Sequence, residues 1–265
     1  MPSQAKRTVA ARRAAATQRL QRTTALAPRD VFCQHCFYSQ KTALTAGMKK
    51  PAARKPTEVP LIVCEYESAS SSRCAHCNEK GKVCEPVYTL LAGNALDLLQ
   101  LTRYARNLTM LDDEDPPADL LDGDTIPLLL SREQRQMVVG TVLDLWEGFG
   151  SILQAHSREH NLGGINTAKK DRVEPLAAYR GHVLNRRQLL AVQNGPRPSD
   201  PAELRAWQQW SLLRLEPGDE MYPFWLVALE GFAEGISAAL NEGDVFQDDW
   251  IIEQMEAIPV RVPNE

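Results

Sequence analysis

Two short stretches decide how the N-terminal part of this chain folds: FCQHCF at residues 32–37 and SSSRCAHCNEKGKVCEPV at residues 70–87. Each contains a Cys-x2-Cys pair, and all six cysteines of the 265-residue chain lie between residues 33 and 84. They are Cys33, Cys36, Cys64, Cys74, Cys77 and Cys84. A tight turn lets both thiolates of such a pair reach one metal ion about 2.3 Å away, and zinc favours these soft ligands. The spacing therefore predicts a zinc-stabilised, cysteine-rich module over residues 31–86.

Six cysteines could instead form three disulfides, but that framework is typical of secreted chains. The N-terminal sequence has no apolar segment of the kind found in a secretory signal, so we expect a reducing compartment, where clustered thiols indicate metal. Two architectures stay open. Either two zinc ions share six thiolates, two of them bridging, or Cys33, Cys36, Cys74 and Cys77 hold one zinc ion while the other two are spare or pair with a histidine. His35 and His76 lie inside the Cys-x2-Cys pairs, where side chains usually point away from the metal.

The charge of the chain is divided unevenly along its length. Residues 1–90 contain 15 Lys and Arg against six acidic residues, and the other 175 residues contain 15 against 28. A net charge of +9 on the first part and -13 on the second suggests an anionic partner for the first part, or attraction between the two parts. Residues 1–30 read as a basic arm or nuclear-localisation patch, a mitochondrial transit peptide, or a disordered tail. No stretch approaches the ~20 apolar residues needed to span a membrane.

The rest of the chain is predicted to be helical. Near-helical spacing of Leu and Ala indicates a helix near 88–107, followed by an acidic linker at 111–127. Ser131 and Gln134 form a possible capping box at the start of a long helix that Asn161-Leu-Gly-Gly closes. Further helices are expected at 175–193, after the Asp200 N-cap, and at 224–240 and 246–257. The sequence therefore predicts a mainly α protein with a basic arm at 1–30, the cysteine module at 31–86, a helix and linker at 87–127, and a helical bundle at 128–265.

One further motif concerns enzyme activity. The sequence His156-Ser-Arg-Glu159-His160 matches H-x-x-E-H, in which both histidines share one helix face and the glutamate can activate a zinc-bound water. Such a site needs a third ligand, and only unspecific glutamates such as Glu234 are available. Histidine and charge are also common at a helix C-terminus because they suit its dipole. We therefore expect no enzyme activity.

The stretch 70–87, with Cys74, Cys77, Gly81-Lys82 and Cys84, resembles the second half of the fungal binuclear zinc cluster. Cys33 and Cys36 match the first knuckle of that family and Cys64 its third cysteine. The resemblance implies six zinc ligands, a nuclear location and transcriptional regulation. It also implies DNA contacts from basic residues after the first knuckle, of which the nearest here are Lys41, Lys49, Lys50, Arg54 and Lys55. The 27 residues between Cys36 and Cys64 depart from the family, which has about six, and FYSQ at 37–40 lacks its basic run. The chain resembles equally well the cysteine-rich domains of filamentous fungi whose role is not established.

The sequence thus leads to two hypotheses of different classes. In the first, the chain is a zinc-cluster DNA-binding protein that takes part in transcriptional regulation. In the second, zinc only stabilises the module, and the acidic helical domain binds another protein. Steep salt dependence of DNA binding would distinguish the first hypothesis from the second.

Overall fold

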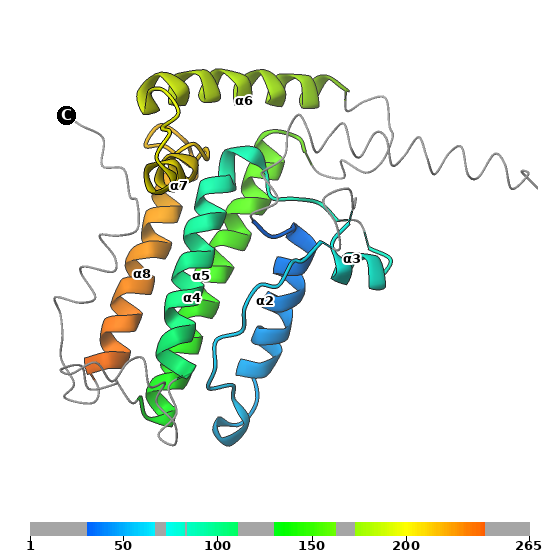
Figure 1. Cartoon of the computed structure of the whole chain (residues 1–265). Helices are drawn as coiled ribbons and strands as arrows, with labels where there is room; N and C mark the ends of the chain where they lie inside the picture. Colours follow the sequence, from blue (N-terminus) through cyan, green and yellow to red (C-terminus); the bar gives the residue numbers. More distant parts are fainter. Residues whose placement is uncertain (1–30, 67–72, 83, 111–129, 163–172, 242–265) are drawn as a thin grey trace, which may run out of the picture. The chain divides into compact units, whose positions relative to one another are not determined.

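The computed structural model describes residues 31–66, 73–82, 84–110, 130–162 and 173–241. Within these ranges the chain forms helices and no strand, apart from one isolated antiparallel bridge between Cys33 and Pro86 (Figure 1). The predicted mainly α fold is confirmed. The elements in chain order are α2 (Gln34–Met48), η1 (Ala52–Arg54), α3 (Ala75–Glu79), η2 (Thr89–Leu91), α4 (Ala92–Met110), α5 (Arg132–Glu159), α6 (Val173–Asn194), α7 (Pro201–Trp210) and α8 (Tyr222–Asn241).

The chain folds into two compact units, each built from three separate segments. The first unit comprises Met1–Phe37, Val63–Ala95 and Leu153–Glu216, and the second comprises Tyr38–Ile62, Leu96–Ile152 and Pro217–Glu265. All six cysteines belong to the first unit.

Long helices form the core of the second unit. The predicted apolar stripe of α5 is confirmed, because Val138, Val142, Leu145, Phe149 and Ile152 are all buried. The ring of Phe149 packs edge-on against Trp225 of α8 with centroids 5.8 Å apart, and Gln134 at the other end of the stripe donates to the carbonyl of Ala239. These two contacts make α5 and α8 antiparallel neighbours. The indole of Trp146 donates to Thr102 Oγ1 at 3.0 Å and so joins α5 to α4.

The first unit is held together mainly by Tyr179 of α6 and by the loop that follows α7. The hydroxyl of Tyr179 accepts a hydrogen bond from the backbone of Leu90 and lies 3.1 Å from His156 Nε2. Asn94 accepts from the backbone of Leu215, and the backbone of Gly93 donates to the carbonyl of Leu213. The buried guanidinium of Arg186 pairs with Glu216 at 3.0 Å. These contacts bring segments far apart in the chain into one unit.

Local signals in the sequence account for several helix ends. The capping box is confirmed, since Gln134 N donates to Ser131 Oγ at 3.1 Å and Ser131 N donates to Gln134 Oε1 at 2.7 Å. Asp200 caps α7 by accepting from the backbone of Glu203, with Pro201 at the first helical position. At the end of α5, Asn161 is in the left-handed region, with φ of 52°, and the predicted C-cap glycines Gly163 and Gly164 lie outside the described residues. Asn tolerates this conformation better than most residues.

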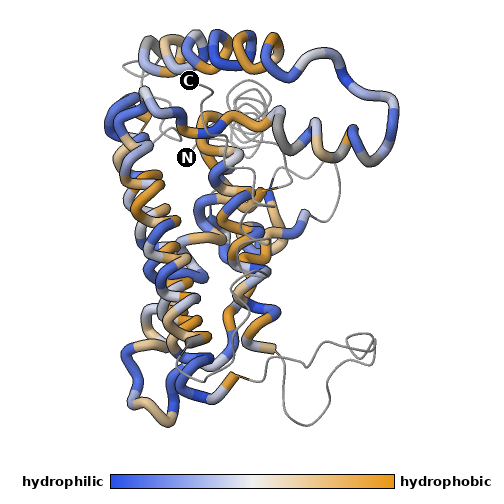
Figure 2. The backbone as a smooth tube through the Cα atoms, turned by 90° about the vertical axis from the view of Figure 1, so that its left-hand side faces the viewer, coloured by the Kyte–Doolittle hydropathy of each residue, from blue (hydrophilic) through white to orange (hydrophobic). Residues whose placement is uncertain are grey.

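The helix α8 is the most apolar of the described helices by mean hydropathy. Tyr222–Leu240 is long and apolar enough to cross a membrane by length and composition alone, and 28% of its most apolar window is buried. The expectation that no stretch approaches this length is therefore wrong for α8. Its Trp225, Phe232 and Ile236 are buried, and α8 packs against α5 in the second unit. Figure 2 shows apolar and polar positions interleaved along the long helices, as expected for amphipathic elements that each bury one face.

Several sequence predictions fall outside the described residues. They are the basic arm at 1–30, the acidic linker at 111–127 and the last helix at 246–257. The predicted division into four domains stays a prediction. The helix α2 between Cys33 and Pro51 was not predicted from the sequence. Its apolar positions, among them the buried Phe37 and Leu44, are too sparse to signal a helix on their own.

Candidate metal centre

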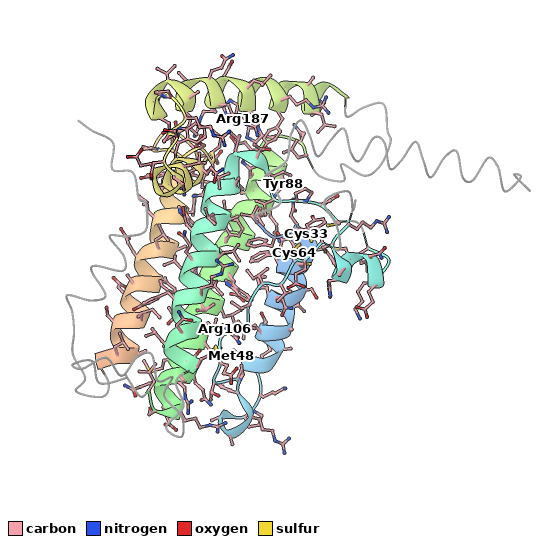
Figure 3. All side chains as sticks on the ribbon, viewed as in Figure 1. Cys33, Met48, Cys64, Tyr88, Arg106 and Arg187 are labelled. Carbon is pink, nitrogen blue, oxygen red and sulfur yellow. The ribbon has the colours of Figure 1, made fainter. Side chains whose placement is uncertain are left out.

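The six predicted metal ligands come together in the first unit. Cys33 precedes α2 and Cys36 lies in its first turn, while Cys74 is the N-cap of α3 and Cys77 lies within it. Five of the six are at most 1% exposed, and Cys64 is half-buried against them. Figure 3 shows Cys33 and Cys64 beside each other. Buried thiols from three separate stretches of the chain therefore face one another.

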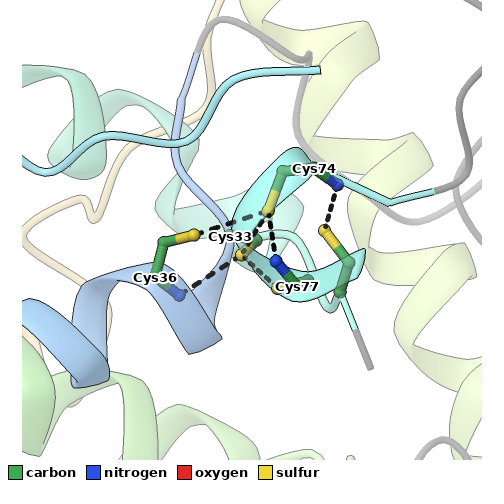
Figure 4. Close-up of a cluster of buried hydrophobic side chains, with 5 residues drawn as sticks. Cys33, Cys36, Cys74 and Cys77 are labelled. Carbon is green, nitrogen blue, oxygen red and sulfur yellow. Dashed lines mark hydrogen bonds between the residues drawn. The ribbon is translucent and has the colours of Figure 1, made fainter. Parts of the chain in front are cut away.

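The sulfurs fall into two groups of four that share two members. One group consists of Cys33, Cys36, Cys64 and Cys74, and the other of Cys33, Cys74, Cys77 and Cys84. In each group the Sγ atoms all lie within 4.8 Å of one another, so each group could hold a metal ion. The shared members are Cys33 and Cys74, whose sulfurs are 3.9 Å apart (Figure 4).

The sulfur–sulfur distances fit tetrahedral metal ligation better than disulfide bonding. Cys33 Sγ lies 3.5 Å from Cys77 Sγ, and Cys36 Sγ lies 3.5 Å from Cys74 Sγ. Four thiolates about 2.3 Å from one tetrahedral ion are separated by about 3.8 Å, whereas disulfide sulfurs are bonded at about 2.05 Å. The geometry of the cysteines is thus suited to a metal ion.

The cluster consists of two halves with the same local hydrogen bonds. In the first half, Cys36 N donates to Cys33 Sγ at 3.3 Å and Cys33 N donates to Cys64 Sγ at 3.2 Å. In the second half, Cys77 N donates to Cys74 Sγ at 3.4 Å and Cys74 N donates to Cys84 Sγ at 3.4 Å. Backbone N–H groups directed at sulfur stabilise thiolates, and such outer partners orient the ligands of a metal site.

Each half is also tied to the other by an equivalent backbone hydrogen bond. Gln34 N, directly after Cys33, donates to the carbonyl of Glu85, directly after Cys84, at 2.7 Å. Ala75 N, directly after Cys74, donates to the carbonyl of Glu65, directly after Cys64, at 2.8 Å. Two equivalent backbone hydrogen bonds therefore join the half formed by Cys33, Cys36 and Cys64 to the half formed by Cys74, Cys77 and Cys84. The two halves are thus approximately symmetric in structure, although the intervals between their cysteines differ in length.

The two histidines inside the Cys-x2-Cys pairs occupy equivalent positions of the two halves. The rings of His35 and His76 stack on each other with centroids 5.6 Å apart, and neither belongs to the groups of four sulfurs. Burial, together with the nearby His76 and Lys82, lowers the pKa of His35, so its neutral form is favoured. The stack accounts for both rings without metal ligation, in line with the expectation that they point away.

The thiols influence one another electrostatically because they are crowded. Hydrogen bonds with the side chains of Cys33 and Cys36 lower the pKa of Cys64 to about 3, and the hydrogen bond with Cys33 lowers the pKa of Cys84 to about 5. Hydrogen bonds with Cys36, Cys64 and Cys84 raise the pKa of Cys33, and burial raises the pKa of Cys77 to about 12. Six thiolates in this space need compensating positive charge, which divalent ions would supply.

The predicted nucleic-acid-binding residues lie in the other unit. Lys41 is on α2, Lys49 and Lys50 follow it, and Arg54 and Lys55 lie at η1, all within Tyr38–Ile62 of the second unit. Lys49, Lys50 and Arg54 are exposed, while Lys41 and Lys55 are half-buried. Four of the five therefore lie in one short loop, and none of them belongs to the unit that contains the cysteines.

The H-x-x-E-H residues form a separate, smaller group in the first unit. A nitrogen of His156, a nitrogen of His160 and a carboxylate oxygen of Glu159 lie within 4.8 Å of one another. Glu234, a possible third ligand by residue type alone, belongs to the second unit and is not part of this group. The ring of His182 on α6 instead lies 5.7 Å from that of His160. His182 was not predicted from the sequence because its partners are on another helix.

Comparison with protein-family models, with curated proteins and with solved structures finds no match to this chain, so the geometry of the two groups of residues is what bears on function.

Proposed function

We propose that the six cysteines hold two zinc ions in a binuclear cluster, with Cys33 and Cys74 as the bridging ligands. The observation that carries this proposal is that two tetrads of sulfurs share those two residues. Cys36 and Cys64 would complete the coordination of one ion, and Cys77 and Cys84 that of the other. The resemblance to the fungal binuclear zinc cluster implies the same six ligands. Zinc suits a closed, four-coordinate set of thiolates that needs no redox chemistry.

We further propose that the protein binds DNA and takes part in transcriptional regulation in the nucleus. This part of the proposal is supported by the basic N-terminal part of the chain and by the exposed Lys49, Lys50 and Arg54. Lys and Arg that neutralise phosphates supply most of the affinity of such proteins for DNA.

The basic loop has a defined anchorage in its own unit. Arg132 Nη2 donates to the carbonyl of Ala53 and Gln136 Nε2 to the carbonyl of Ala52, both at 2.8 Å, so the start of α5 holds η1. By contrast, the first residues after Cys36 cannot take the role that basic residues have in the family. Phe37 is buried, and Tyr38 donates its hydroxyl proton to the carbonyl of Gly150. Phosphate contacts would therefore come from residues 49–55.

Salt dependence of duplex binding tests the DNA proposal. The triple variant Lys49→Gln, Lys50→Gln, Arg54→Gln should weaken binding and reduce the slope of log K against log salt by about 0.9 for each phosphate that is no longer neutralised, up to about 3 in total. Fluorescence anisotropy with random-sequence duplex measures both quantities. Lys80→Gln is the matched control, because Lys80 is exposed and already lies 3.9 Å from Glu79. An unchanged slope in the triple variant would exclude the loop as the phosphate-binding surface.

A second candidate function is protein binding by the helical part of the chain. The observation in its favour is the outward face of α6. Tyr179, Val183 and Arg186 form the buried stripe of this helix, whereas Leu184, Leu189 and Val192 are 57%, 61% and 83% exposed. Large apolar side chains grouped on one exposed helix are typical of an interaction surface. If the wild-type chain shows no salt-dependent DNA binding at all, this interaction function replaces the DNA proposal.

A further inference from the structure

Three of the five histidines of the chain gather where α5 ends and α6 passes. The rings of His156 and His160 are 4.5 Å apart, and the ring of His182 is 5.7 Å from that of His160. Tyr179 closes the group, with its ring 5.5 Å from His156 and 5.1 Å from His160. All four residues belong to the first unit.

The spacing of the donors on α5 directs three ligand atoms to one place. Residues at i, i+3 and i+4 of a helix lie on the same face, which places Glu159 and His160 beside His156. One donor atom from each of these residues lies within 4.8 Å of the other two. Four nitrogen and oxygen ligands around a tetrahedral zinc ion are about 3.4 Å apart, and His160 Nε2 already lies 3.8 Å from Glu159 Oε1. The side chains of His160 and Glu159 are 21% and 42% exposed and can rotate to reach that separation.

The least mobile member, His156, is already oriented by an outer partner. It is 3% exposed, and its Nε2 lies 3.1 Å from the hydroxyl of Tyr179, which also accepts from the backbone of Leu90. A histidine that binds metal through one ring nitrogen normally hydrogen-bonds through the other, and that bond sets its tautomer and orientation.

We propose that His156, Glu159 and His160 form a second site for a divalent transition-metal ion, with the exposed His182 as the fourth ligand. The site takes nitrogen and oxygen donors, so it suits zinc, nickel or copper and differs in chemistry from the six-sulfur cluster. A bound ion links the last turn of α5 to α6. The proposal depends neither on the cysteine cluster nor on DNA binding.

The rival explanation is that the histidines only complement the dipole of α5. Imidazole near a helix C-terminus is stabilised there without any ion. That explanation accounts for His156 and His160 but predicts no role in metal binding for His182, which lies on a different helix. A test must therefore measure bound metal and must include a variant on α6.

The experiment compares metal content between full-length variants under identical conditions. Wild-type protein, His160→Ala and His182→Ala are dialysed to equilibrium against increasing Zn²⁺, and zinc per chain is measured by elemental analysis. The wild type should hold one zinc ion more than His160→Ala, and His182→Ala should bind that ion about tenfold more weakly. His76→Ala is the matched control, because it also removes a histidine but one that stacks on His35. It should keep the extra ion.

Two additional measurements keep the result interpretable. Co²⁺ added to protein that holds zinc in its cysteine cluster but has not been dialysed against extra Zn²⁺ should give a visible spectrum without the thiolate charge-transfer band of cysteine-bound cobalt. Tyr179→Phe removes the outer partner without touching a ligand and should weaken binding of the extra ion by about 10- to 100-fold. Equal zinc content in wild type and His160→Ala would overturn the proposal and leave a dipole-stabilised imidazole cluster. A thiolate band for the added cobalt would overturn it as well.

Discussion

Cys33 and Cys74 differ from the other four cysteines in how many sulfur tetrads they belong to. Both lie in each of the two tetrads, whereas Cys36, Cys64, Cys77 and Cys84 each lie in one. A bridging ligand is shared by two ions, so its removal should affect both, while removal of a terminal ligand should affect mainly one. The two architectures left open by the sequence can therefore be separated one residue at a time.

Substitution of single cysteines should change the zinc content in an unequal way. We expect Cys74→Ser to release both ions, because neither tetrad is then complete, and Cys64→Ser to keep about one ion per chain in the tetrad that it does not enter. Elemental analysis after gel filtration under reducing conditions provides the measurement. Cys64 is the terminal ligand of choice because it is only half-buried, so the serine disturbs packing least. Loss of all zinc in both variants would contradict a division into bridging and terminal ligands.

At the scale of single elements, α8 carries two glycines in different surroundings. A Cβ at Gly235 would overlap Thr141 Oγ1 of α5 and come within 2.7 Å of its Cγ2, whereas a Cβ at Gly231 would meet nothing within 4 Å. Gly235 thus permits the close approach of α5 and α8, and Gly231 only lowers the helix propensity of an exposed position. The antiparallel pairing of these helices depends on the first glycine.

Alanine at the two glycines should change the stability of the protein in opposite directions. Gly235→Ala should lower the free energy of unfolding by about 1–3 kcal/mol, because the β-branched Thr141 cannot move aside without a shift of the helix. Gly231→Ala should raise it by up to about 1 kcal/mol through helix propensity alone. Urea denaturation followed by Trp fluorescence reports both, since Trp146 and Trp225 are buried in the same unit. A Gly235→Ala variant as stable as Gly231→Ala would show that the helices are not in close contact.

At the scale of the whole molecule, the cysteines and the large apolar core belong to different units. The first unit contains the sulfur cluster, and the second contains the stripe of α5 that packs on α8. The second unit can bury apolar surface without any metal. The segment 73–82 of the first unit buries only Cys74 and Cys77, so it has few alternatives to the cluster as a source of stability, as in other small metal-stabilised modules.

Removal of metal should therefore loosen one unit before the other. With a strong chelator present, we expect faster backbone hydrogen exchange in residues 73–82 and little change in residues 132–152. Hydrogen exchange followed by mass spectrometry, with and without chelator at one pH, makes the comparison within a single chain. Equal protection of both segments before and after chelation would argue against a stabilising metal, and uniform loss of protection would show that the two units unfold together.

Local sequence patterns are sufficient to predict the helical class, the candidate ligand residues and several helix ends. The Ser131–Gln134 capping box and the Asp200 cap were predictable because they depend on residues three positions apart, and the stripe of α5 was predictable because helical periodicity is local. The spacing of the cysteines does not show which of them share a tetrad, because the loops between them differ in length and their paths depend on tertiary packing. Only the tertiary structure also decided that the basic loop lies in the other unit and that His182 lies beside His160. These contacts join residues on separate elements, so they exist only after packing has brought those elements together.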